Sequence, residues 1–187
     1  DTVARVWRYC VDYAEELPLT PSRLIYLSGC DLRCDFCISE SNAFDPGRGV
    51  PLTAAWLEGV LKWAVAQGAR TLQWIGGEPT LHAPAILDAL ARCRQRLPVV
   101  WKSDFYGTPE TWELLDGVVD VYVADFKFGS DACAQRIAGV ERYMEIVTRN
   151  LADTERRGQL YVRHLLLPGP HQCCLRPIMA LPQQRLP

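Results

Sequence analysis

The 187-residue sequence contains no apolar run near the roughly 20 residues that a helix needs to cross a bilayer. It also lacks an excess of basic residues, since 20 Lys and Arg stand against 22 Asp and Glu, a net charge of −2. Neither a membrane nor a nucleic-acid backbone is therefore an expected partner. The stretch from Asp1 to Tyr9 has no apolar core of the kind that secretory signals carry. We expect a cytoplasmic protein.

Cysteine, by contrast, is plentiful, with eight residues in the chain. In a reducing compartment, cysteines serve as metal ligands or buried thiols more often than as disulfides. The role of the cysteines therefore depends on where they lie relative to the secondary structure.

Short apolar runs alternate with helix-like stretches along the chain. We expect strands at residues 24–28, 71–75, 99–103, 118–124 and 160–167. We expect helices at residues 53–67, 84–96, 108–115, 131–138 and 143–157. This alternation predicts an α/β fold with a parallel sheet and right-handed crossovers. It fits both an open TIM-like barrel and a doubly wound sheet, and in both folds ligands bind beyond the carboxyl ends of the strands.

Three cysteines follow the first expected strand: Cys30, Cys34 and Cys37. Three thiolates within eight residues can ligate three of the four irons of a [4Fe–4S] cluster, which leaves the fourth iron open to a substrate or cofactor. The alternatives are a zinc site that lacks a ligand and a chance group of buried thiols. Zinc sites usually pair two such units, and the sequence has no second one.

Gly76-Gly77-Glu78-Pro79 follows the second expected strand. Two glycines let a ligand approach the backbone closely, so the amides and carbonyls at the strand end become usable. By itself this tetrapeptide is typical of a simple turn. Its position on the strand after the cysteine loop favours a binding role.

The cysteine motif, with Phe36 before its last cysteine, and the Gly-Gly-Glu motif together resemble the radical S-adenosylmethionine (SAM) superfamily. Within it, the chain most resembles the activating enzymes of glycyl radical enzymes, in particular relatives of pyruvate formate-lyase activase. The likeness covers about residues 15–170 and includes Glu15-Glu16-Leu17-Pro18 and the segment Arg163–Gly169. It implies a partial TIM-like barrel of parallel strands with outer helices. It also implies reductive cleavage of SAM to a 5′-deoxyadenosyl radical, which takes a hydrogen atom from the substrate.

The resemblance assigns roles to individual residues at successive strand ends. The cluster ligands would be the three cysteines, and the other SAM contacts would be Phe36, Gly76, Gly77, Glu78, Asp125, Lys127, Arg163 and Leu165. Arg163 would lie near the SAM carboxylate, and Phe36 and Leu165 near its adenine. Asp125 and Lys127 are two residues apart, so on a strand they face the same side.

One strand end departs from the activases. Lys102-Ser103-Asp104 stands where the activases have Asp-Thr-Asn, whose Asp helps to bind a monovalent cation close to the SAM carboxylate. Our hypothesis is that the ammonium of Lys102 replaces this cation, since both supply one positive charge. The alternative is a solvated lysine at a strand end.

We expect a single domain made of an N-terminal extension (1–22), the barrel core (23–170) and a C-terminal segment (171–187). The activases carry a sixth strand, and we expect that this chain stops before it, because the last residues suit no further helix and strand. The exposed sheet edge would then need a cover, for which a macromolecular substrate is one candidate. His171, Cys173 and Cys174 could hold an auxiliary metal or line the mouth of the site.

Two classes of function are compatible with these patterns. The first is a radical SAM enzyme that acts on a protein glycine, a peptide or a small molecule, with a low-potential flavodoxin or ferredoxin as electron donor. The second is a non-catalytic iron–sulfur module for electron transfer or sensing. An open iron implies sensitivity to oxygen in either case.

Overall fold

The computed structural model describes residues 3–13, 16–166 and 174–185, to which all structural statements below refer. The strands are β1 (Arg5–Asp12), β2 (Ser22–Leu27), β3 (Val50–Pro51), β4 (Thr71–Ile75), β5 (Val99–Ser103), β6 (Val121–Asp125) and β7 (Gln159–Arg163). The helices are α1 (Glu40–Ala43), α2 (Ala54–Ala66), α3 (Ala83–Arg92), α4 (Pro109–Leu115), α5 (Asp131–Ala138), α6 (Tyr143–Thr154) and α7 (Arg176–Arg185). Two short 3₁₀ turns complete the list, η1 (Leu17–Leu19) and η2 (Pro79–His82).

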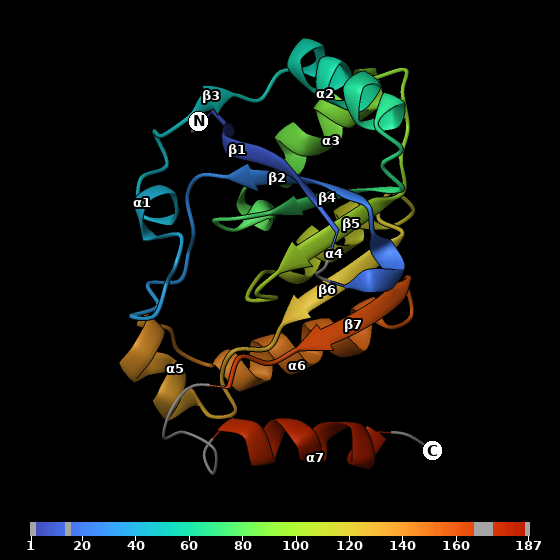
Figure 1. Cartoon of the computed structure of the whole chain (residues 1–187). Coiled ribbons are helices and arrows are strands. Elements are labelled where there is room, and N and C mark those ends of the chain that lie inside the picture. Colours follow the sequence, from blue (N-terminus) through green and yellow to red (C-terminus); the bar gives the residue numbers. More distant parts are fainter. Residues whose placement is uncertain (1–2, 14–15, 167–173, 186–187) are drawn as a thin grey trace.

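The strands form one curved sheet in the order β3-β1-β2-β4-β5-β6-β7 (Figure 1). From β2 to β7 all neighbours are parallel, because helical crossovers return the chain to the same end of the sheet each time. The described strands leave the sheet open between β3 and β7, which confirms the expected partial barrel.

Helices cover the convex face of the sheet and bury the larger part of the core. Leu57 of α2, Trp112 of α4 and the strand residues Trp74, Trp101 and Tyr122 are all fully buried there. A smaller apolar group, Leu19, Val100, Val121 and Val123, fills the concave face. Since side chains alternate along a strand, the concave sides of β5, β6 and β7 end at the carboxyl edge in the polar residues Lys102, Asp125 and Arg163.

The sequence located the parallel strands better than the segments around them. Residues 71–75, 99–103 and 131–138 have the expected bounds. The last strand was expected to reach residue 167, but β7 ends at Arg163, whose carbonyl accepts a hydrogen bond from Phe126 N at 2.9 Å. The helix expected at 84–96 ends at Arg92.

Residues 5–12 of the expected N-terminal extension form β1, which pairs antiparallel with β2. β1 was missed because its charged and apolar residues are mixed and most of its side chains are only partly buried. β3 was also missed, and it pairs with β1 through two residues. Helix α7, likewise not expected, carries Pro177 in its first turn, where proline is tolerated. Among the described residues, no helix has both the length and the apolar character needed to cross a membrane.

The loop after β5 depends on a buried amide from α6. Asn150 Nδ2 donates to the carbonyls of Phe105 (2.8 Å) and Gly107 (2.9 Å). Phe105 is fully buried with a φ of 61°, a conformation that aromatic residues rarely adopt. Asn150 therefore helps to hold the backbone that follows Asp104.

We expect Asn150→Ala to lower the free energy of unfolding by about 2 kcal/mol, because it leaves a buried carbonyl without its donor. Denaturant unfolding measures this loss. The matched control is Glu145→Ala, an exposed residue of α6 whose ion pair with Arg142 should contribute less than about 0.5 kcal/mol. Equal losses in the two variants would contradict the assignment.

Candidate functional site

The cysteine loop begins directly after β2 and is fixed to the end of α5. Arg33 N donates to Ala138 O at 3.1 Å, and Asp35 N donates to Ile137 O at 3.0 Å. The last carbonyls of a helix lack partners within the helix, so the loop satisfies them. In return, the helix holds the loop that carries Cys30, Cys34 and Cys37 at the carboxyl edge of the sheet.

The loop after β4 packs against this cysteine loop. Glu78 N donates to Gly29 O at 2.8 Å. Gly76 and Gly77 have φ angles of +74° and +41°, and a Cβ on Gly77 would overlap the carbonyl oxygen of Gly29. Glycine is therefore required here for both its conformation and its lack of a side chain. Gly76 and Gly77 remain partly exposed beside the thiols.

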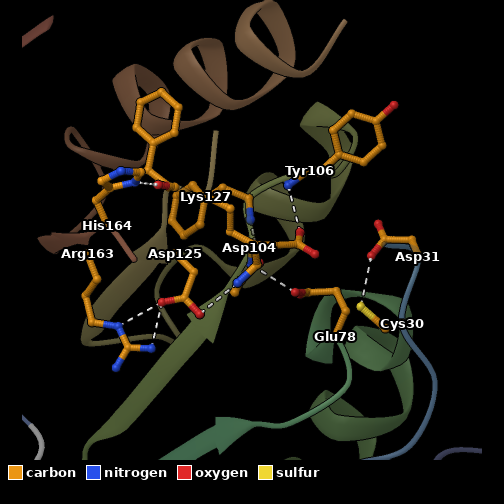
Figure 2. A network of polar contacts seen from close by, with 12 residues as sticks. Cys30, Asp31, Glu78, Asp104, Tyr106, Asp125, Lys127, Arg163 and His164 are labelled. Carbon is orange, nitrogen blue, oxygen red and sulfur yellow. Dashed lines mark hydrogen bonds and ion pairs between the residues drawn. The ribbon is translucent and has the colours of Figure 1, made fainter. Parts of the chain in front are cut away.

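Three carboxyl groups surround Cys30, namely Asp31, Glu78 and Asp104 (Figure 2). Glu78 is almost fully buried, and its carboxylate accepts hydrogen bonds from Thr80 N (2.9 Å) and from Asp104 N (2.9 Å). Burial and the neighbouring Asp104 raise the pKa of Glu78 to about 8. Burial and Glu78 raise the pKa of Asp31 to about 6. This acidic group forms one pole of the site.

The pKa values of two thiols are also raised beside the acidic pole. Burial raises the pKa of Cys34 to about 11. Burial, followed by the charges of Asp104, Glu78 and Asp31, raises the pKa of Cys30 further. Only thiolates bind metals well, so both cysteines need a bound cation to stabilise their ionised form.

A chain of alternating charges forms the opposite pole (Figure 2 shows Asp125, Lys127 and Arg163). Glu16 accepts from Lys102 Nζ at 2.9 Å and from Arg163 Nη1 at 2.7 Å. Arg163 also donates to Asp125 Oδ1 through Nε (2.8 Å) and Nη2 (2.7 Å). Asp125 Oδ2 in turn pairs with Lys127 Nζ at 3.2 Å. The order is cation, anion, cation, anion, cation, with one net positive charge.

The environment of Asp125 keeps it ionised within this chain. Burial alone would raise the pKa of Asp125, but Lys127 and Arg163 outweigh burial and hold the pKa below its usual value. Burial likewise opposes the charge of Lys127, but Asp125 and then Asp104 raise its pKa. Lys127 thus lies between the two poles.

The structure brings most of the predicted site residues together. Asp125 and Lys127 face the same space, as expected from their spacing. Lys102 is not a solvated lysine, because only 1% of its side chain is exposed, and its ammonium pairs with Glu16. Ser103 points into the protein, where its hydroxyl accepts a hydrogen bond from Phe105 N at 3.0 Å.

The remaining predicted residues lie around the edge of the site. Phe36 is half-buried against Phe128, with ring centroids 6.1 Å apart. Leu165 follows β7 and is exposed. Cys174 is buried, so it does not line the mouth of the site, and His171 and Cys173 lie outside the described residues.

Glu16 is the residue that sequence reasoning missed. It belongs to the Glu15-Glu16-Leu17-Pro18 segment, which was noted only for its resemblance to the activases. Its partner Arg163 lies 147 positions away in the chain, a contact that local patterns do not reveal.

The sequence profile of the Radical SAM superfamily matches residues 24–180. This chain belongs to the radical SAM superfamily. "Uncharacterized protein MJ0674" of Methanocaldococcus jannaschii is 36% identical to this chain over 174 residues. The match covers 88% of this chain and 50% of that protein. The GTP 3′,8-cyclase of Synechococcus elongatus is 28% identical over 102 residues, 54% of this chain and 30% of the cyclase. This chain thus spans half or less of the length of the curated relatives that it matches.

Solved structures show the same fold. Streptococcus suis SuiB bound to its precursor peptide SuiA superimposes with a TM-score of 0.63 at 17% identity, over 86% of this chain and 35% of SuiB. SuiB bound to S-adenosylmethionine gives a TM-score of 0.54 at 16% identity, over 87% of this chain and 34% of SuiB. At such low identity, the likeness concerns the fold of this radical SAM chain.

The superfamily implies a [4Fe–4S] cluster and SAM, and the residues present fit both groups. The three cysteines occupy one loop, and the acidic surroundings of Cys30 call for a cation there. A Cβ on Gly76 or Gly77 would collide with Tyr26 or with the carbonyl oxygen of Gly29, so both glycines are needed where this turn packs against β2 and the cysteine loop. Their backbone remains partly exposed. The likeness to the activating enzymes of glycyl radical enzymes rests on sequence motifs alone.

We expect Glu16→Gln to lower the free energy of unfolding by about 3–5 kcal/mol, since it removes the carboxylate that faces a buried ammonium. The double variant Glu16→Gln/Lys102→Met should regain at least half of the loss, because both members of the buried pair are then neutral. Urea unfolding of both single variants and the double variant completes the cycle. Simple addition of the two single losses would rule out coupling between Glu16 and Lys102.

We expect the cluster-free protein to become less stable as the pH rises from 5 to 8. The unfolded chain releases the Glu78 proton near pH ~4.3, whereas the folded protein keeps it until about pH 8, so ionisation in between favours unfolding. The loss should be roughly 2–4 kcal/mol in unfolding experiments at pH 5, 6.5 and 8. Glu78→Gln should flatten the profile, while Glu155→Gln at an exposed position should not. A profile that is flat in the wild type would refute this expectation.

Proposed function

We propose that this chain is the catalytic core of a radical SAM enzyme. Cys30, Cys34 and Cys37 hold a [4Fe–4S] cluster, whose electron cleaves SAM to methionine and a 5′-deoxyadenosyl radical that abstracts hydrogen from the substrate. The observation that carries the proposal is the presence of two oppositely charged poles beside one cysteine loop. SAM itself is bipolar, since its ammonium and sulfonium are cationic and its carboxylate is anionic.

The acidic pole suits the cationic groups of SAM. Asp31 and Glu78 lie beside Cys30, and the backbone of Gly76 and Gly77 is partly exposed. A cation that enters this region is stabilised by carboxylates that are largely out of water, where charges interact more strongly. The carbonyls and carboxylates here position the amino group.

The chain of alternating charges suits the carboxylate of SAM. Arg163 and Lys127 are its more exposed cations, and a guanidinium can bind a carboxylate through two hydrogen bonds. Lys102 lies behind Glu16, so it contributes through that carboxylate rather than by direct contact. In this arrangement Lys102 need not replace a bound cation. By the sequence resemblance, Phe36 and the backbone of Leu165 would contact the adenine.

The hydrogen donor that the sequence resemblance suggests is a protein glycine, as in activation of a glycyl radical enzyme. A peptide is the second candidate, since SuiB, which shares the fold, was solved with its precursor peptide. The electron would come from a low-potential flavodoxin or ferredoxin in the cytoplasm. A simple electron-transfer module has no use for Arg163, Lys127 and the Gly76-Gly77 turn at neighbouring strand ends, so the enzymatic function is favoured.

The proposal predicts that anaerobically reconstituted protein with SAM and dithionite forms 5′-deoxyadenosine, which mass spectrometry quantifies. Cys34→Ala should abolish the product, because it removes a cluster ligand. Cys133→Ala is the matched control, since Cys133 is a buried thiol of α5 and should retain activity. A fully loaded cluster that leaves SAM intact would favour the electron-transfer module.

A further inference from the structure

The loop after β6 carries Lys127 between the two poles of the site. Figure 2 shows its side chain between Asp125 and Asp104, both of which stabilise its charge. Its ammonium pairs with Asp125 Oδ2 at 3.2 Å. Lysine has a flexible four-carbon stem, so the place of the ammonium is defined only if the backbone from which the stem starts is held.

The peptide group between Phe126 and Lys127 is held at both of its ends. Its oxygen, on Phe126, accepts a hydrogen bond from His164 Nδ1 at 2.7 Å, drawn in Figure 2. Its N–H, on Lys127, donates to the Tyr143 hydroxyl at 2.8 Å. The C=O and N–H of a trans peptide point in opposite directions, so the two partners hold it from opposite sides. His164 directly follows β7, and Tyr143 begins α6.

Tyr143 suits this task in both its ring and its hydroxyl. The side chain is fully buried, and its ring packs edge-on against Phe128 with centroids 5.2 Å apart. Phe128 in turn contacts Phe36 of the cysteine loop. Burial raises the pKa of Tyr143 well above its usual value, so the hydroxyl stays neutral and can accept from the backbone. A phenylalanine would pack in the same way, so the hydroxyl contributes the hydrogen bond to Lys127.

We propose that Tyr143 and His164 are positioning residues of the site. They fix the peptide group that precedes Lys127, and they thereby direct its ammonium toward the carboxylate of SAM. This role rests on the proposed function, because it takes SAM as the molecule that Lys127 contacts. Both residues act through Lys127 rather than on the ligand itself.

The first measurement is the affinity of the reconstituted protein for SAM, by equilibrium dialysis with the cluster oxidised so that SAM is not cleaved. Tyr143→Phe should weaken binding about tenfold, the scale of a misplaced hydrogen bond to a charged group. His164→Ala should act in the same direction. His164→Asn should recover most of the affinity, because the amide of asparagine can donate in place of Nδ1.

Tyr122→Phe is the matched control and should bind SAM as the wild type does. Tyr122 is a fully buried tyrosine of β6, and its hydroxyl has no hydrogen-bond partner within the part of the chain that the structure describes. The control therefore removes a buried phenolic hydroxyl from the same region without removing a contact to Lys127.

A double-variant cycle separates positioning from a general effect on the fold. In the Lys127→Met background, Tyr143→Phe should weaken SAM binding less than about twofold, because no ammonium is left to direct. Hydrogen–deuterium exchange of the reconstituted protein is a second readout, and it needs no SAM. Exchange at the Lys127 amide should be at least about tenfold faster in Tyr143→Phe, because the amide has lost its acceptor.

Unchanged affinity in Tyr143→Phe would overturn the proposal. So would an equal loss of affinity from Tyr143→Phe in the wild-type and Lys127→Met backgrounds, because the hydroxyl would then act on the fold as a whole. A wild type that holds a cluster but binds no SAM would refute the proposed function. Faster exchange at Lys127 in Tyr143→Phe would even then support the hold of Tyr143 on this backbone.

Discussion

The chain of charges from Lys102 to Lys127 is the interaction on which the inner face of this barrel depends. Its members come from the N-terminal segment and from β5, β6 and β7, so it ties the first residues of the chain to the last strands. Buried ion pairs add little stability compared with apolar residues of the same size, but loss of one partner is costly. The chain of charges therefore serves mainly to fix the side chains of Arg163 and Lys127 at one end of the site.

The two poles of the site differ in how their charges are compensated. Each cation of the basic pole faces a carboxylate, and the pKa of Asp125 is lowered accordingly. The acidic pole has raised pKa values at Asp31, Glu78 and Asp104 because its carboxyl groups are buried and face one another. Such a region is stable only when protons or cations occupy it, which makes it the natural place for the iron and for the positive groups of a ligand.

The sequence predicted the parts of the fold that repeat a local pattern. The strands at 71–75 and 99–103 are continuous apolar runs between clear stops, and the structure has them unchanged. β1 was not predicted, because a strand near the edge of the sheet with half-exposed faces lacks that pattern. Asp125, Lys127 and Arg163 were placed at strand ends from spacing and resemblance. Glu16 could not be found in this way, because its role depends on a contact between distant segments. The burial of Lys102 likewise depends on that contact.

The attachment of the cysteine loop to the end of α5 bears on how the protein matures. During synthesis, the cysteines emerge long before Ile137 and Ala138, whose carbonyls later hold the loop. Until that helix has formed and docked, the three thiols have no fixed arrangement to offer to an iron–sulfur carrier. The arrangement of these three thiols is therefore fixed late in folding, once the C-terminal half of the barrel has assembled.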